Sequence, residues 1–250
     1  MMKGFWTEIK KIKRKWIWGA PAGIFLVDLA WMCWTLSELE SGELKDGCYR
    51  ILMSLPMINT ITLPVLAAVL ASRLCDMENK GNTYKLLCTL QEKGAIFRNK
   101  FILGGLHILV FAFLQLSMIV FLVWYYRIPQ ELEAEQMVYF FLSTCATTIV
   151  LLLLQEVLSL MMDNQLYPLF IGLIGTFVGL FSWFFSLPLR YLTPWGYYCV
   201  GCTINNIYYK ETREVVFYTV SFSYGGFAAL LLFAAVLYIY GKNLFLKKEV

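Results

Sequence analysis

The sequence predicts an all-α polytopic membrane protein with six transmembrane helices, and three observations carry that prediction. Of the 250 residues, 59% are hydrophobic and 15% are charged, whereas about a quarter of the residues of a typical soluble domain are charged. Apolar runs of about 20 residues, the length needed to cross a hydrocarbon core of about 30 Å, lie between short polar stretches. The runs do not alternate polar and apolar faces, so lipid is the expected solvent.

Polar segments of unequal length separate the six predicted spans. We place the spans at about 17–36, 51–72, 101–126, 138–162, 166–187 and 219–241. A long polar segment, 73–100, follows the second span, and an aromatic-rich segment, 188–218, precedes the last. No small-residue cleavage site follows the first apolar run, which we interpret as an uncleaved span within a single transmembrane domain, 1–250.

The distribution of basic residues predicts the orientation of these spans. With the N-terminus inside, fifteen of the 21 Lys and Arg residues fall on the cytoplasmic side, and six fall outside. Cytoplasmic loops carry such an excess of basic residues. We therefore expect both termini and the segment 73–100 in the cytoplasm, and the segment 188–218 outside.

Residues 1–16 have the pattern of a basic amphipathic helix. Large apolar residues recur there at helical spacing between lysines and an arginine, namely Met2, Phe5, Trp6, Ile9, Ile12 and Trp16. Such a helix suits the headgroup layer of the inner leaflet. It is either a topology anchor or an elbow helix that also contacts a cytoplasmic partner.

Three ionisable residues lie within the predicted spans. Asp28 is near the middle of the first span, a depth that costs about 3 kcal/mol on insertion scales. It either lines a wet path or fixes helix packing. His107 and Glu156 lie at similar depths from the inner side, and we expect them to pair; the alternative is that Glu156 extends unpaired toward the cytoplasm.

Small residues and aromatic residues mark two further regions. The fifth span carries Gly172, Gly175 and Gly179, which permit close approach of helix backbones. Outside, Pro194 is placed to open a short helix. Trp195, Tyr197 and Tyr198 follow it and suit an interfacial aromatic belt, as do Tyr208 and Tyr209.

No pattern in the chain carries covalent chemistry. The single histidine excludes multi-histidine metal sites, and neither a His-Glu-x-x-His nor a Gly-x-Ser-x-Gly motif is present. Cys199 and Cys202 form one Cys-x-x-Cys without partner ligands, which is weak evidence for a redox or metal site. The chain also lacks a phosphate-binding Gly-x-x-x-x-Gly-Lys-Ser/Thr loop.

The order of parts resembles the permease subunit of type-two ABC exporters, most of all the permeases of lantibiotic self-protection systems. The resemblance covers the whole chain as architecture, with a local match after the second span at Glu78, Gly81, Tyr84, Lys85, Leu86 and Leu87. Lys100 fits the lysine that opens the third span in that family. Gln91 stands where the family often has a proline, so the end of the intervening helix is undetermined.

The resemblance implies that a separate ATPase grips residues 78–90. The expected contacts are Glu78, Lys80, Gly81, Tyr84, Lys85, Leu87 and Leu90. The apolar stripe of Tyr84, Leu87 and Leu90 would dock into a groove of the ATPase; the alternative is a helix that lies on lipid.

The resemblance also implies the remaining partners and roles. Two ATPase subunits would hold ATP and Mg, and this chain would bind no cofactor and no nucleic acid. A second, non-identical permease would meet the glycine face, unless that face packs within the subunit. The segment with Trp195, Tyr197 and Tyr198 would form an outer gate, unless it only anchors to headgroups.

The function that the resemblance implies is expulsion of a lantibiotic or similar membrane-active peptide across a bacterial cytoplasmic membrane, which gives immunity or resistance. Three alternatives stay open: an exporter of another drug or a lipid, an ATP-independent carrier or structural subunit, and a membrane-embedded enzyme. The absence of catalytic motifs argues against the last of these.

Overall fold

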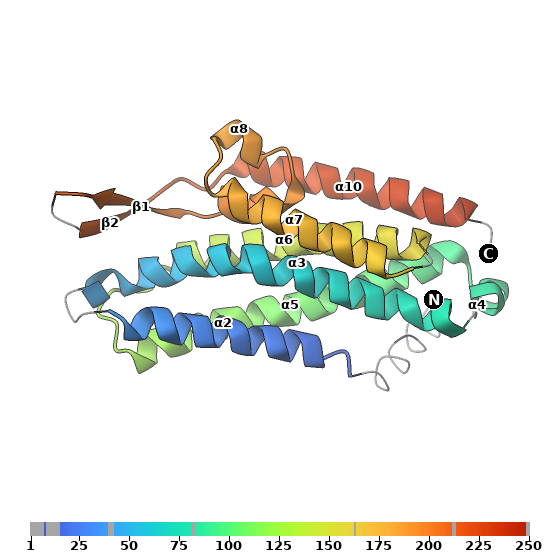
Figure 1. Cartoon of the computed structure of the whole chain (residues 1–250), viewed down its shortest axis with the longest axis horizontal. Coiled ribbons are helices and arrows are strands. Elements are labelled where there is room, and N and C mark those ends of the chain that lie inside the picture. The colour runs from blue at the N-terminus through green and yellow to red at the C-terminus, as the bar shows by residue number, and fades with distance from the viewer. Residues whose placement is uncertain are drawn as a thin grey trace.

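The computed structural model describes residues 8, 16–39, 43–81, 84–162, 164–211 and 214–248. Six long helices run side by side in this part of the chain (Figure 1). They are α2 (Gly19–Ser37), α3 (Gly47–Gly81), α5 (Lys93–Tyr125), α6 (Ala134–Met161), α7 (Leu166–Ser182) and α10 (Tyr224–Lys247). The helical prediction is therefore confirmed for most of the chain.

Short elements mark the two ends of the bundle. At one end lies α4 (Tyr84–Leu90), which we call the α4 end; at the other lies a hairpin of β1 (Ile204–Tyr209) and β2 (Glu214–Thr219), which we call the hairpin end (Figure 1). The remaining short elements are η1 (Glu43–Asp46), α8 (Leu187–Arg190), η2 (Pro194–Gly196) and α9 (Tyr197–Val200). As predicted, Pro194 opens a short helix.

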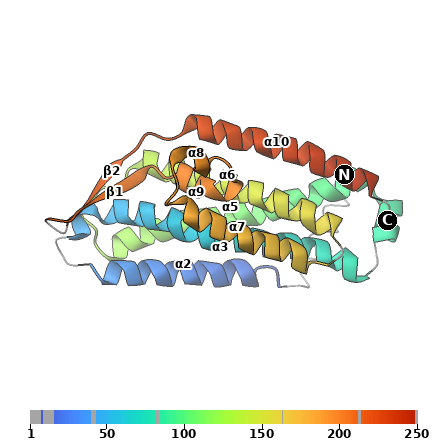
Figure 2. The same ribbon diagram turned by 45° about the horizontal axis from the view of Figure 1, so that its top comes forward.

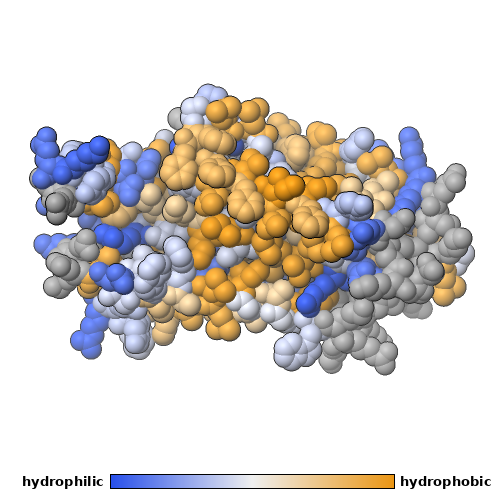
Figure 3. Space-filling view, in the orientation of Figure 1, coloured by the Kyte–Doolittle hydropathy of each residue, from blue (hydrophilic) through white to orange (hydrophobic). Residues whose placement is uncertain are grey.

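Helix α3 forms the centre of the bundle, and α2 and α10 lie at its opposite edges (Figure 2). In the most apolar stretch of α3, 72% of the residues are buried, compared with 22% for α2 and 17% for α10. Most of the side chains that α2 and α10 leave exposed are apolar, and hydrophobic surface covers the middle of the molecule between more polar ends (Figure 3). This belt is the surface expected of a protein that lipid surrounds.

Five of the long helices are long and apolar enough to cross a membrane, and α7 is a shorter apolar helix of 17 residues. The prediction of six equivalent spans is thus confirmed for five. Helix α7 ends at Ser182 rather than near 187, because the chain turns there into α8. Of the predicted elbow, 1–16, only Glu8 and Trp16 belong to the described residues, so the elbow lies outside the structure's description.

The β-hairpin corrects the all-helical prediction for the aromatic-rich segment. Strands β1 and β2 pair antiparallel, with Ile204 opposite Thr219 and Tyr209 opposite Glu214. The predicted start of the last span at 219 was wrong, because the apolar, β-branched residues of β2 merge with the following apolar run in the sequence. Helix α10 begins only at Tyr224, where the Ser223 side chain accepts a hydrogen bond from the Gly226 N–H and caps it.

Polar side chains help to accommodate a proline inside α3. Pro56 cannot donate a backbone hydrogen bond to the Leu52 carbonyl. The Cys202 thiol lies 4.0 Å from that carbonyl oxygen. One turn further on, the Thr60 hydroxyl donates to the Pro56 carbonyl and accepts from the Trp183 indole N–H. These contacts tie the segment after α7 to the central helix.

Candidate functional site

A buried ion cluster lies at the α4 end of the bundle. The Lys100 side chain on α5 is fully buried, and its Nζ lies 2.7 Å from Oε2 of Glu78 on α3 and 3.5 Å from Oε2 of Glu8. The same ammonium donates to the Leu74 carbonyl oxygen. A buried charge requires such partners, so this cluster links the N-terminal segment to two long helices.

The cluster corrects the expected role of Glu78. We expected Glu78 to contact an ATPase, but only 1% of its surface is exposed and it is the nearest carboxylate to Lys100. Helix α5 begins at Lys93, about two turns before Lys100, so Lys100 lies within the helix that carries the third predicted span. No local pattern indicates this pair, since 21 residues separate Glu78 from Lys100 in the chain.

Helix α4 presents apolar side chains on its outer surface. Leu86 is 62% exposed and Leu90 is 73% exposed, whereas Leu87 packs against the core cluster that contains Phe97 and Leu160. The predicted stripe of Tyr84, Leu87 and Leu90 is therefore wrong for Leu87, which turns inward. The side chains of Lys80, Gly81, Tyr84 and Lys85 lie outside the described residues.

The ends of α5, α6 and α10 are joined to one another near the end of α4. The Lys93 ammonium, three residues after α4, donates to the Lys248 carbonyl oxygen at 2.6 Å. The Lys248 ammonium in turn donates to the Leu160 carbonyl at the end of α6. Cations at helix C-termini satisfy carbonyls that lack a partner within the helix. The end of α4 thus lies next to the joined ends of α5, α6 and α10.

A polar network joins α2, α3 and α5 inside the apolar belt. The buried Asp28 carboxylate accepts a hydrogen bond from Gln115 Nε2 at 2.8 Å, and Gln115 and Asn59 exchange two amide hydrogen bonds of 2.7 and 3.1 Å. Asp28 Oδ1 has no hydrogen-bond partner among the described residues. Asp28 thus faces neighbouring helices. Asn59 and Gln115 were not predicted as site residues, although amide side chains within long apolar runs are a detectable signal.

The predicted pair of His107 and Glu156 does not form. The His107 ring lies 4.5 Å from the Trp18 ring, and its Nδ1 is 2.7 Å from the Leu103 carbonyl oxygen. Glu156 is 1% exposed, so it does not extend into solvent either. It lies within electrostatic reach of Lys100. The pairing was wrong because depth along a helix does not specify which face a side chain occupies.

The glycine face of α7 packs within this chain. A Cβ at Gly175 would overlap the Trp195 ring, one at Gly179 would lie 2.8 Å from Thr60, and one at Gly172 would lie 2.7 Å from the Gln155 amide. The three glycines are buried and therefore do not form an open surface for a second permease.

The aromatic residues before the hairpin insert among the helices. Tyr198 is 2% exposed and its hydroxyl lies 2.9 Å from Thr148 Oγ1 on α6, and Tyr197 is also buried. Trp195 is half-buried against α7. The expectation of an interfacial belt was therefore wrong for these three residues, whereas Tyr208 and Tyr209 on β1 are exposed. The burial of Tyr197 and Tyr198, with Trp195 half-buried, places the expected gate residues among the helices.

Comparison with protein families finds a match over most of the chain. The family model described as ABC-2 family transporter protein matches residues 5–179, which is more than two thirds of the chain. The match extends from the N-terminal segment through α7 and includes the ion cluster, α4 and the polar network. No curated protein matches the chain.

Proposed function

Since the chain belongs to the ABC-2 transporter family and is a membrane-spanning permease of that class, we propose that it expels a membrane-active peptide, a lantibiotic or a similar antimicrobial. Removal of the peptide would protect the cell that carries the transporter. The membrane would be the bacterial cytoplasmic membrane, with the α4 end and both termini in the cytoplasm, as the basic residues favour.

The exposed leucines of α4 are the observation that carries the ATP-driven part of this proposal. An ABC permease works with an ATPase, which must push on an element outside the membrane. Leu86 and Leu90 project from a short helix whose end lies next to the joined ends of α5, α6 and α10. An apolar helix face that enters a groove is a common mode of recognition. The two leucines would be the anchors, in place of the stripe expected from the sequence.

The buried ion cluster supports a mechanism for transmitting the push. Helix α4 lies between α3 and α5 in the chain, so its movement would act directly on both. Lys100 on α5 binds Glu78 on α3. Because buried ions are costly to separate, α3 and α5 would move together. Two ATPase subunits with ATP and Mg, and a second permease, would complete the transporter.

The choice of a peptide as the substrate comes from the family resemblance in the sequence. The structure is consistent with a route that begins in lipid, because α2 and α10 leave most of their surface exposed to it. A membrane-active peptide already lies in the bilayer, and a permease could receive it from there.

Co-purification tests the coupling surface. We expect the double change Leu86→Ser and Leu90→Ser to lower recovery of the ATPase at least about tenfold, because loss of an apolar anchor costs about 1.4 kcal/mol or more. Thr89→Ala on the same helix, also exposed, is the matched control and should leave recovery unchanged. Recovery equal to wild type in the double variant would contradict the role of α4.

Two further measurements test the class and the substrate. Absence of any ATPase from the purified wild-type complex would instead favour an ATP-independent carrier or a structural subunit. For the substrate, cells with the complete transporter should tolerate more lantibiotic, and the serine variant should lose that tolerance. Protection against an unrelated apolar drug but not against the peptide would overturn the peptide assignment.

A further inference from the structure

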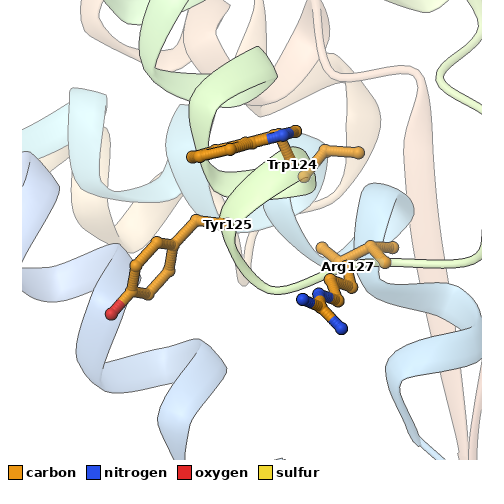
Figure 4. A pocket seen from close by; sticks show the side chains of 5 residues that line it. Trp124, Tyr125 and Arg127 are labelled. Atoms are coloured by element: carbon orange, nitrogen blue, oxygen red, sulfur yellow. The ribbon is translucent and has the colours of Figure 1, made fainter.

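A hollow lies at the C-terminal end of α5, at the hairpin end of the bundle. It has a volume of about 530 Å³ and is lined by Val123, Trp124, Tyr125, Arg127 and Ile128. We call it the Arg127 pocket. In Figure 4, Trp124 lies across the hollow, and Tyr125 and Arg127 extend on either side of it. Its size falls within the range of small-molecule sites, about 300–1,000 Å³.

The side chains of Tyr126 and Ile128, on either side of Arg127 in the chain, contact other helices, so Arg127 itself points outward. The Tyr126 hydroxyl donates to the Cys33 carbonyl on α2 at 3.1 Å, and Ile128 is buried against Gly47 at the start of α3. Between these anchors Arg127 has a φ of 50°. This left-handed conformation is uncommon for a residue with a side chain and indicates a constrained backbone. The turn therefore presents the guanidinium from a fixed base.

The Arg127 guanidinium has no hydrogen-bond or ion-pair partner in the part of the chain that the structure describes. Trp124 is 72% exposed and Tyr125 is 61% exposed. Trp and Tyr at the end of an apolar helix are typical of the headgroup layer. A planar guanidinium there matches the geometry of a phosphate, which it binds through two parallel hydrogen bonds.

We propose that the Arg127 pocket binds the phosphate of an anionic lipid headgroup. The guanidinium would bind the phosphate oxygens, and Trp124 and Tyr125 would pack against the glycerol and the first acyl carbons. The position of the pocket at the end of a membrane-crossing helix favours a lipid, because the pocket opens where headgroups lie. Lipid binding at this pocket requires neither an ATPase nor a peptide, so its test is independent of the proposed function.

The test measures lipid retained by the purified full-length chain. We would purify it from vesicles of equal parts phosphatidylglycerol and phosphatidylcholine and count bound lipids by native mass spectrometry. Arg127→Asn removes the cation and keeps a residue that tolerates the left-handed conformation. We expect this change to lower the retained phosphatidylglycerol roughly tenfold, because a charge-assisted hydrogen bond is lost. The variant Arg127→Lys should retain more phosphatidylglycerol than Arg127→Asn.

Lys210→Asn is the matched control, since it removes one exposed cation at the same end, between β1 and β2. It should leave phosphatidylglycerol retention unchanged. Retention at the wild-type level in Arg127→Asn would overturn the proposal, as would an equal loss in Lys210→Asn, which would show bulk charge attraction alone. Full displacement of the lipid by millimolar inorganic phosphate would assign the site to free phosphate and overturn the lipid assignment.

Discussion

The Lys100 ammonium on α5 and the Glu78 carboxylate on α3 lie 2.7 Å apart in a site where both side chains are at most 2% exposed. The pair connects two helices that leave the membrane belt on either side of α4. Because Glu8 also reaches Lys100, three segments of the chain meet at a single cation. Its removal should therefore affect the whole α4 end.

Replacement of Lys100 should destabilise the protein strongly. Lys100→Met keeps an unbranched side chain up to Cε but removes the ammonium that Glu78 and Glu8 contact, a loss of about 3–5 kcal/mol for a broken buried pair. The thermal unfolding midpoint in detergent measures the effect. Lys45→Met, which removes an exposed cation, is the control, and an equal midpoint for the two variants would contradict a structural role for the cluster.

A methyl group at Gly175 should disrupt the contact with Trp195. Gly175→Ala places a Cβ inside the Trp195 ring, so α7 must move or the indole must leave. Gly105→Ala meets nothing within 4 Å in α5 and should be neutral or stabilise the helix by up to about 1 kcal/mol. Unfolding midpoints compare the two, and partial rescue of Gly175→Ala by Trp195→Ala would identify the contact.

The amide network should behave as a unit. Gln115→Leu leaves both Asp28 and Asn59 without their main partner, and we expect a loss of about 1–2 kcal/mol, since polar contacts in membranes are modest. Asn59→Leu added to Gln115→Leu should cost less than the sum of the two single changes. Additive unfolding free energies would show that the two amides stabilise the bundle separately.

The thiols of Cys199 and Cys202 should resist labelling at neutral pH. Burial raises the pKa of the Cys199 thiol to about 11 and that of Cys202 to about 12, and both lie outside the five long apolar helices. Thiolates react and thiols do not, so a maleimide should label neither residue in the folded chain at pH 7. Rapid labelling at that pH would contradict their burial.

The same shifts predict how stability depends on pH. In the unfolded chain these thiols ionise near pH 9, the ordinary value for a cysteine. Above that pH the unfolded state releases protons that the folded state keeps, so the contribution to stability is complete below pH 9 and declines between about pH 9 and 12. Chemical unfolding of the wild type and of a Cys199→Ser, Cys202→Ser variant would measure it, and the variant should show the smaller decline.

Much of the architecture could be read from the order of residues. The apolar runs identify the long helices because a backbone in lipid must satisfy its hydrogen bonds internally. Pro194 marks a helix start because its fixed φ suits the first helical position. The position of α4 between two long helices was also predictable, and the proposed coupling surface lies on this helix.

The contacts between helices could not be read in this way. Leu86 and Leu87 are adjacent leucines in one short helix, yet the first is exposed and the second packs inward. His107 and Glu156 share a depth but turn toward different neighbours. The strand Glu214–Thr219 resembles the start of a membrane span until its pairing with Ile204–Tyr209 is known.

The sequence by itself determined that this chain is a membrane protein, which of its segments are helical and which side of the membrane the basic residues favour. These properties depend on the transfer of each segment from water to lipid. Only the tertiary structure decided that Lys100 binds Glu78 and Glu8, that Gln115 joins Asp28 to Asn59, and that Trp195 fills the glycine face of α7. These contacts depend on the rotation of each helix about its axis, and packing against neighbouring helices sets that rotation.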